Sequence, residues 1–136
     1  MKVLSTMAAR TALVAATVFI TCSAFAAAPE SVTSIAGNYS GYAYNGQNLD
    51  PVLTVLAFDE SGRFMGSYKV DDENSPFQGT LSGLIQEEER AFSMQWTDKD
   101  GEGFVYMEFN ADYSSFSGFW TDPGGEDQFP WNGRRQ

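Results

Sequence analysis

Short runs of aromatic and β-branched residues alternate with clusters of Asp, Gly, Asn and Ser along the chain after residue 37. Within the runs, apolar and polar side chains tend to alternate, and no stretch shows the roughly 3.6-residue period of an amphipathic helix. The intervening Asp and Gly clusters are typical of tight turns between strands. The sequence therefore predicts an all-β domain built from short strands.

Eight such runs can be counted, and every connection between them is short. Short connections pair neighbouring strands antiparallel. An eight-stranded meander closes into an up-and-down barrel that leaves no sheet edge unpaired, whereas the competing two-sheet sandwich usually needs a longer crossover. We therefore predict one eight-stranded antiparallel up-and-down barrel over residues 37–136. Its predicted strands cover residues 38–44, 52–58, 63–70, 77–84, 90–97, 104–110, 115–121 and 128–133.

Residues 1–26 differ from the rest in composition. Lys2 and Arg10 precede a short apolar run that ends in Ala24-Phe25-Ala26. Basic residues, a short apolar core and an A-x-A site are the parts of a secretory signal peptide. We predict a signal peptide over residues 1–26, cleaved at Ala26 or within a residue or two, with a retained N-terminal anchor as the alternative. Residues 27–36 would form a leader that could include a brief helical turn.

The single cysteine, Cys22, lies inside this segment. A bacterial lipoprotein would keep such a cysteine as its lipidated first residue, but Thr21 stands where a small Gly or Ala is usual, so lipid attachment is not expected. Without Cys22 the exported protein has no intrachain disulfide, and its core must stabilise it unaided. We predict a periplasmic or extracellular protein with no membrane span in the mature chain.

The chain is strongly acidic, with a net charge of −10 at pH 7. Loss of Lys2 and Arg10 with the signal peptide would change this charge to −12. Such a charge repels the phosphates of nucleic acids and anionic lipid surfaces, so neither is predicted as a partner. It also favours solubility in an exposed compartment.

Two residue types that serve many enzymatic mechanisms are missing from the predicted mature chain, and acidic pairs, although possible, are common by chance among 18 acidic residues. Histidine is absent, and the only cysteine lies in the predicted signal peptide. Acid–base and nucleophilic mechanisms that depend on these side chains are therefore closed. The sequence also holds no G-x-S-x-G motif, P-loop or glycine-rich cofactor motif. We predict a non-catalytic protein without a cofactor.

Three acidic segments could suggest a metal site. Residues 98–102, D-K-D-G-E, begin like a calcium loop, and residues 71–74 and 122–127 offer further clustered oxygens. A calcium loop needs about six or seven oxygens at fixed offsets, and none of these segments has them. We interpret them as hairpin turns built from Asp and Gly, and we predict no metal site.

Glycine recurs between large residues inside the strands, as in FMGSY, FQGTL and FSGFW. Side-chain alternation places Phe64, Gly66 and Tyr68 on one face, opposite Arg63 and Lys69, so the glycine-bearing face should point into the barrel. The interior of an eight-stranded barrel is narrow, and alternating large and small residues let opposed strands interdigitate. The inward glycines are therefore expected to provide space for neighbouring rings.

Aromatic side chains from most of the strands would share this interior. An apolar lining with a few polar tips is typical of small-molecule pockets, yet the same rings could fill a barrel that is barely wide enough for side chains. Sequence alone does not decide between an open and a filled interior. The leading hypothesis is a binding protein for a small apolar or aromatic ligand. The candidate ligand-binding residues are Tyr39, Phe64, Tyr68, Phe92, Trp96, Tyr106, Phe116 and Trp120.

The sixth predicted strand is apolar on both faces, as is the second. If Phe104 and Tyr106 point inward, the opposite face becomes an exposed apolar stripe, and such a stripe would suggest a protein partner or a homo-oligomer. If the opposite face points inward, no stripe exists and Tyr106 lies on the surface. The second hypothesis is therefore a protein-interaction module, such as an envelope component or an inhibitor. The candidate partner patch consists of Val105, Met107, Phe109 and Phe119.

The segments LTVLAFDESGRFMGSYKV, SPFQGTLSG and FSMQW resemble the second to fifth strands of avidin-type barrels. Gly37-Asn38-Tyr39 stands where calycins, the superfamily of lipocalins, avidins and their relatives, carry Gly-x-Trp. In calycins a basic residue near the last strand covers that aromatic ring, and Arg134 or Arg135 could do so here. The resemblance implies a calycin-like eight-stranded barrel.

Tyr68 and Trp96 match two positions of the avidin ligand site. Other positions depart from that pattern, since Gly41 occupies the place of an Asn ligand in the first strand and Val70 replaces a Ser. The segment FPWNG stands where avidins carry a late Thr-x-Trp-Leu-Leu strand. The resemblance therefore implies an interior pocket, but not biotin as its ligand.

Overall fold

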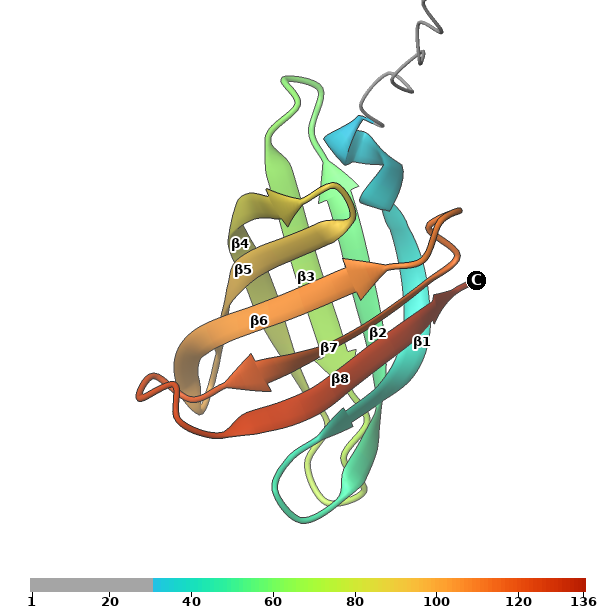
Figure 1. Cartoon of the computed structure of the whole chain (residues 1–136). Coiled ribbons are helices and arrows are strands. Elements are labelled where there is room, and N and C mark those ends of the chain that lie inside the picture. The colour runs from blue at the N-terminus through green and yellow to red at the C-terminus, as the bar shows by residue number, and fades with distance from the viewer. Residues whose placement is uncertain (1–30) are drawn as a thin grey trace, which may run out of the picture.

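The computed structural model describes residues 31–136, which form a closed eight-stranded barrel preceded by a short 3-10 helix (Figure 1). The prediction of an all-β, antiparallel up-and-down barrel is confirmed, and the predicted signal peptide lies outside the described residues. Within residues 31–136 no helix has the length and apolarity needed to cross a membrane. The elements are η1 (Val32–Ile35), β1 (Gly37–Tyr44), β2 (Leu49–Phe58), β3 (Phe64–Val70), β4 (Phe77–Glu88), β5 (Ala91–Asp98), β6 (Gly101–Phe109), β7 (Ser115–Thr121) and β8 (Gln128–Arg135).

Each strand pairs with the next one along the chain, and β8 pairs with β1 to close the barrel. Because the strands alternate in direction, alternate connections lie at the same end. We call the end formed by the loops at residues 45–48, 71–76, 99–100 and 122–127 the mouth. The opposite end, covered by η1, is called the closed end. In Figure 1 the β1–β2 and β3–β4 loops hang at the bottom, and η1 lies at the top.

β6 points Val105, Met107 and Phe109 into the barrel, and Met107 has no exposed surface. The hypothesis of an exposed stripe on these three residues is therefore wrong. The physical reason is charge, because Glu102 and Glu108 share the other face of the strand. Burying two carboxylates would cost far more than exposing two aromatic rings.

The outer face of β6 nevertheless carries aromatic side chains. Tyr106 lies outside the barrel and stacks on Phe119 of β7, with their ring centroids 5.5 Å apart. Phe104, two residues earlier, is 63% exposed. The expectation that Tyr106 lines the interior is therefore wrong, whereas the outward orientation of Phe119 agrees with the alternation of its strand.

The second ambiguous strand, β2, is resolved by burial. Val52, Thr54 and Leu56 point inward and are almost fully buried. Thr54 is the one polar member of this set, and its hydroxyl accepts a hydrogen bond from Trp131 Nε1 at 3.1 Å. A buried hydroxyl needs such a partner, so Thr54 and Trp131 fix each other across the barrel.

Inward glycines make room for rings, as the alternation predicted. A methyl group added to Gly79 would overlap the ring of Tyr68. A methyl group on Gly66 would lie 2.6 Å from Leu81 Cβ and 2.7 Å from Phe64 Cζ, closer than carbon atoms approach without a shift. The inward-facing rings therefore fit only because glycine has no side chain at these positions.

Gly83 breaks the alternation of β4, because it follows Gly79 and Leu81 at every second position but does not point inward. It is exposed rather than inward, its φ is +65°, and the pairing of β4 with β5 shifts register between Ser82 and Ile85. A positive φ suits glycine, and an extra residue of this kind produces a β-bulge that bends the strand. Gly83 thus contributes to the curvature that lets the long strand β4 follow the closing barrel.

The closed end is sealed by Arg135, whose guanidinium carbon lies 5.2 Å from the centroid of the Tyr39 ring. Its Nη2 donates hydrogen bonds to the hydroxyl of Tyr39 and to Ser34 O, both at 2.8 Å, and its Nε donates to Tyr113 O at 3.0 Å. Ile35 of η1 is completely buried beneath these contacts. Of the two arginines predicted to cover Tyr39, Arg135 does so, and the helical turn considered for the leader is present.

Aromatic rings fill the half of the barrel next to this seal. Phe109 lies at the centre of the group, with ring centroids 5.6–5.8 Å from those of its neighbours. Such edge-to-face and tilted packing leaves little space between rings. The neighbours of Phe109 are Tyr39, Phe92, Tyr113 and Phe116.

Candidate functional site at the barrel mouth

A cavity of about 410 Å³ opens at the mouth and extends into the barrel. This volume falls within the range of known small-molecule pockets. Its walls include the aromatic residues Tyr44, Tyr68, Phe77, Trp96, Trp120 and Trp131. Its charged lining consists of Asp50, Asp72, Asp98, Lys99, Asp100 and Asp122.

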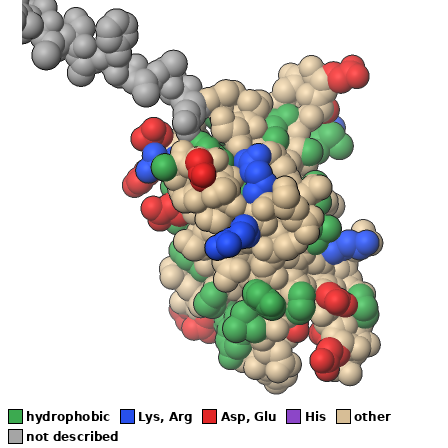
Figure 2. Space-filling view, turned by 90° about the vertical axis from the view of Figure 1, so that its right-hand side faces the viewer, with side chains coloured by type: hydrophobic (Ala, Val, Ile, Leu, Met, Phe, Trp, Pro, Cys, Tyr) green, Lys and Arg blue, Asp and Glu red, His purple; other side chains and the backbone are tan. Residues whose placement is uncertain are grey.

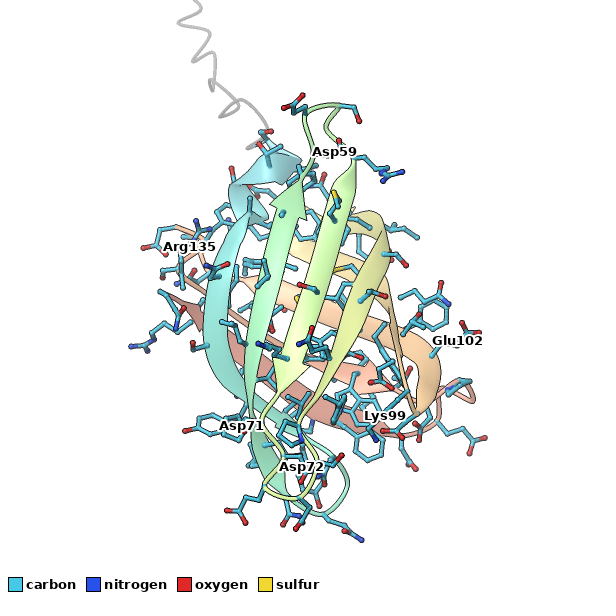
Figure 3. All side chains as sticks on the ribbon, turned by 180° about the vertical axis from the view of Figure 1, so that it is seen from behind. Asp59, Asp71, Asp72, Lys99, Glu102 and Arg135 are labelled. Carbon is cyan, nitrogen blue, oxygen red and sulfur yellow. The ribbon has the colours of Figure 1, made fainter. Side chains whose placement is uncertain are left out.

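The figures show the same combination of apolar and acidic groups at this end. In Figure 3, Asp71, Asp72 and Lys99 lie at the lower end of the barrel, opposite Asp59. In Figure 2, hydrophobic side chains gather near the lower end of the visible face, with acidic side chains beside them. The mouth is therefore both apolar and negatively charged.

Strand position explains why aromatic rings gather at the mouth. Tyr68, Trp96 and Trp120 stand near the ends of β3, β5 and β7, and all three strands run toward the mouth. Phe77 begins β4, and Trp131 stands in the first half of β8; both strands run away from the mouth. Inward-facing aromatics on both kinds of strand thus meet at one level of the barrel.

Ring-to-ring contacts hold these walls in place. Tyr68 and Trp131 meet edge to face, with ring centroids 5.0 Å apart and planes at 75°. Trp96 and Trp120 meet in the same way at 5.6 Å and 88°. Such contacts stabilise particular ring orientations. The cavity walls are therefore largely preformed.

The indole N–H groups around the cavity all donate within the protein. Buried donors of this kind need partners, and these bonds fix the rings further. They also leave the ring faces and edges, rather than the N–H groups, to contact a bound molecule. The bonds are Trp96 Nε1 to Thr121 O at 3.0 Å, Trp120 Nε1 to Tyr44 O at 2.9 Å and Trp131 Nε1 to Thr54 Oγ1 at 3.1 Å.

Tyr68 and Asp98 link the aromatic wall to the acidic rim. The hydroxyl of Tyr68 donates to Asp98 Oδ2 at 2.7 Å. Burial raises the pKa of Tyr68 above its usual range, and the hydrogen bond to Asp98 raises it further. Tyr68 therefore stays a neutral donor, with its proton directed at Asp98.

Lys99 is the one lysine in the cavity lining. Its ammonium donates to both carboxylate oxygens of Asp100, at 2.9 and 3.0 Å, and lies 4.9 Å from the centroid of the Phe77 ring. The hydrogen bond to Asp100 raises the pKa of Lys99, so the ammonium form is favoured. The rim thus already holds one cation between a carboxylate and an aromatic face.

Only part of the predicted ligand-binding set reaches this cavity. Tyr68, Trp96 and Trp120 line it. Tyr39, Phe92 and Phe116 belong to the packed half near the closed end, and Phe64 contacts Phe58 with ring centroids 5.5 Å apart. Tyr106 lies outside the barrel, as described above. The structure brings together the predicted residues that stand near the mouth and separates the others.

Trp131 and Phe77 line the cavity but were missing from the predicted set. Alternation along β8 would have placed Phe129, Trp131 and Gly133 on one face, as it did for β7. Alternation with Gly79 places Phe77 on the inward face of β4, and its position as the first residue of that strand places it at the mouth.

A second hollow, of about 740 Å³, lies along the mouth-side ends of β1 to β4. It is more open to solvent, and Tyr42 and Phe77 are the two aromatic side chains in its lining. Specific pockets bury most of a ligand. The smaller aromatic cavity is therefore the better candidate site.

No protein-family profile matches the chain, and no sufficiently similar curated protein was found. The closed eight-stranded meander is consistent with a calycin-like fold. Fold likeness does not establish function, so the functional argument depends on the cavity itself.

Proposed function

We propose that this protein is a non-catalytic, exported binding protein that holds a small ligand with an apolar or aromatic body in the mouth cavity. The observation that carries this proposal is the unequal filling of the barrel. Rings pack closely in the half near the closed end, whereas a cavity of about 410 Å³ remains at the mouth.

Protein interiors normally contain few voids larger than a water molecule. The packed half demonstrates that the aromatic residues of this chain can fill such a barrel. The open half is lined by rings that are held by hydrogen bonds and edge contacts, which limits how far they can collapse inward. A ligand that covers these rings would gain about 25 cal/mol for each Å² of apolar surface removed from water.

Export and the lack of catalysis are supported by the sequence. Residues 1–26 have the composition of a signal peptide, and the chain contains no histidine. The acidic side chains at the mouth stand beside aromatic walls that have no nucleophile of their own. Binding is therefore the simplest use of the cavity.

Tryptophan fluorescence tests the proposal directly, because all 3 tryptophans of the chain line the cavity. Benzyl alcohol, 2-phenylethanol and cinnamyl alcohol serve as probes. Each is titrated to about 10 mM, a concentration high enough to detect weak binding of a small ligand. We expect a saturable change in emission with at least one of them. A response that stays linear for all three would contradict the proposal.

A matched pair of variants locates the response. Trp120→Ala removes one wall of the cavity and should weaken binding about tenfold, equivalent to about 1.4 kcal/mol. Phe104→Ala removes an exposed ring from the outer face of β6 and should leave the affinity unchanged. Equal loss of affinity in the two variants would place the binding site elsewhere.

The second candidate function is a protein-interaction module. The observation in its favour is the outer aromatic group of Phe104, Tyr106 and Phe119, since exposed apolar patches often mark interfaces. If this group mediates self-association, sedimentation velocity should detect a concentration-dependent dimer that Phe104→Asp abolishes. A protein that sediments as a monomer at all concentrations would contradict self-association through this group.

A further inference from the structure

Hydrogen-bonding capacity at the mouth is strongly one-sided. The donors of the aromatic walls are engaged, since the indole N–H groups and the hydroxyl of Tyr68 all donate to protein acceptors. The rim carries five aspartates. Four of them already accept hydrogen bonds within the protein, but these bonds use only part of their lone pairs; the four are Asp50, Asp72, Asp98 and Asp100. An ionised carboxylate offers about four lone-pair sites and no donor. The cavity therefore suits a ligand that brings its own hydrogen-bond donors.

Charge is distributed unevenly between the two ends of the barrel. Within residues 31–136 the arginines lie toward the closed end, where they offset part of the charge of acidic residues such as Asp59, Glu60 and Glu89; they are Arg63, Arg90, Arg134 and Arg135. Carboxylates dominate three of the mouth loops. These loops carry Asp71, Asp72, Glu73, Asp100, Asp122, Glu126 and Asp127. Such an arrangement draws cations toward the mouth and repels anions from it.

Lys99 provides a local example of how a cation is held there. Its ammonium makes two hydrogen bonds to Asp100 and lies 4.9 Å from the centroid of the Phe77 ring. A carboxylate and an aromatic face are the two groups that an organic ammonium also prefers. Because Asp100 already neutralises Lys99, that lysine is a poor anchor for an anionic ligand.

We infer that the ligand of the mouth cavity is an organic cation, a primary or quaternary amine with an aromatic or apolar body. This inference rests on the proposed function. The body would cover the rings of Trp96, Trp120 and Trp131, and the ammonium would lie at the rim within reach of Asp98 and its neighbours. The rings offer π faces and the rim offers acceptors, so both parts of such a ligand find complementary groups.

The placement of the carboxylates favours an organic cation over a bound metal ion. Metal sites bring several ligands to one point, at about 2.0–2.6 Å from the ion. Within residues 31–136 no group of three acidic side chains converges in that way. The rim aspartates come from different strands and loops and surround the cavity, which suits a diffuse charge on a larger molecule.

Three compounds with the same phenyl ring and different charges test the inference. These are 2-phenylethylamine as the cation, 2-phenylethanol as the neutral compound and 3-phenylpropionate as the anion, each titrated into the protein by calorimetry at pH 7. We expect the amine to bind at least tenfold more tightly than the alcohol and the anion to bind least. The preference for the amine should shrink as the salt concentration rises, because the rim is open to solvent.

A conservative pair of variants separates local from general charge effects. Asp98→Asn removes one charge at the rim but keeps an oxygen that can accept the Tyr68 hydrogen bond. Glu60→Gln removes one charge from the exposed β2–β3 turn at the other end of the barrel. We expect Asp98→Asn to weaken binding of the amine at least fivefold more than binding of the alcohol, whereas Glu60→Gln should change neither.

The outcomes distinguish this inference from the proposed function. If the alcohol or the anion binds as tightly as the amine, the inference is overturned and the proposed function stands. If Glu60→Gln weakens the amine as much as Asp98→Asn, the effect is one of net charge, and the inference is overturned. If none of the three compounds binds, the inference is overturned. If, in addition, none of the neutral alcohols produces a saturable fluorescence change, the proposed function is overturned as well.

Discussion

Gly79 shows how a single missing side chain shapes the site. Its Cα hydrogen faces the ring of Tyr68, and a methyl group there would overlap that ring. We predict that Gly79→Ala lowers the free energy of unfolding by about 1–3 kcal/mol, the usual cost of overpacking. Gly124→Ala is the matched control, because its methyl group would meet nothing within 4 Å. Urea denaturation measures both, and equal stability of the two variants would contradict the steric role of Gly79.

Tyr68 gives the protein a predicted sensitivity to alkaline pH. Burial and the hydrogen bond to Asp98 raise its pKa in the folded state above the usual value of about 10. The folded protein therefore holds this proton more tightly than the unfolded chain, and the associated stability is present below about pH 10 and is lost as the pH rises further. The free energy of unfolding should accordingly fall as the pH rises above about 10.

The Tyr68→Phe substitution should reduce the loss of stability at alkaline pH. It also removes the hydrogen bond to Asp98, so it should lower stability near pH 7 by about 1 kcal/mol. The control is Tyr42→Phe, which changes an exposed ring on β1. Urea denaturation at about pH 8 and 11 compares the variants with the unmodified protein. An identical alkaline loss in the unmodified protein and the Tyr68→Phe variant would show that other groups cause it.

Among the elements, η1 and the end of β8 depend on each other. Arg135 donates to carbonyl groups on both sides of the closed end, including Ser34 O and Ala36 O, and to Tyr113 O. We predict that Arg135→Met destabilises the protein by about 2 kcal/mol, because hydrogen bonds to a charged group are lost together. Thermal unfolding would measure this change.

Arg134→Met is the control for that prediction. Arg134 is also exposed and stands next to Arg135 on β8, so the substitution removes the same charge and adds the same side chain. Its expected effect is within about 0.5 kcal/mol, as for most surface substitutions. If both variants lose the same stability, the effect comes from charge and not from sealing the closed end.

Alternation along the strands predicted most inward faces, because charged residues on β3 and the Ser and Thr residues on β5 and β7 mark the outer side. Alternation alone did not decide which face of β6 points inward. Glu102 and Glu108 share one face, and their charge indicates that this face points to solvent. Gly83 departs from the alternation of β4 for a different reason. A bulge interrupts strict alternation, and a β-bulge depends on local backbone geometry that a simple period does not reveal.

For the molecule as a whole, the closed barrel was predictable because eight short runs with short connections leave few alternatives. Whether its interior is open was not predictable, since the answer differs between the two ends. The two-residue period predicts which side chains point inward. Whether the barrel interior is filled at a given level depends on how far along its strand each aromatic ring stands. Phe116 and Trp120 share one face of β7, yet Phe116 belongs to the packed half and Trp120 lines the cavity.

The measurement that most directly tests binding at the mouth is a nuclear magnetic resonance titration of the ¹⁵N-labelled protein with 2-phenylethylamine. The indole N–H signals of Trp96, Trp120 and Trp131 report on the cavity, and the backbone amides of Phe92 and Phe109 report on the packed half. Saturable shifts of the three indole signals, with the packed half unchanged, are the predicted result. Unchanged indole signals, together with shifts at Phe104 and Phe119 on the outer face, would contradict a binding site at the mouth.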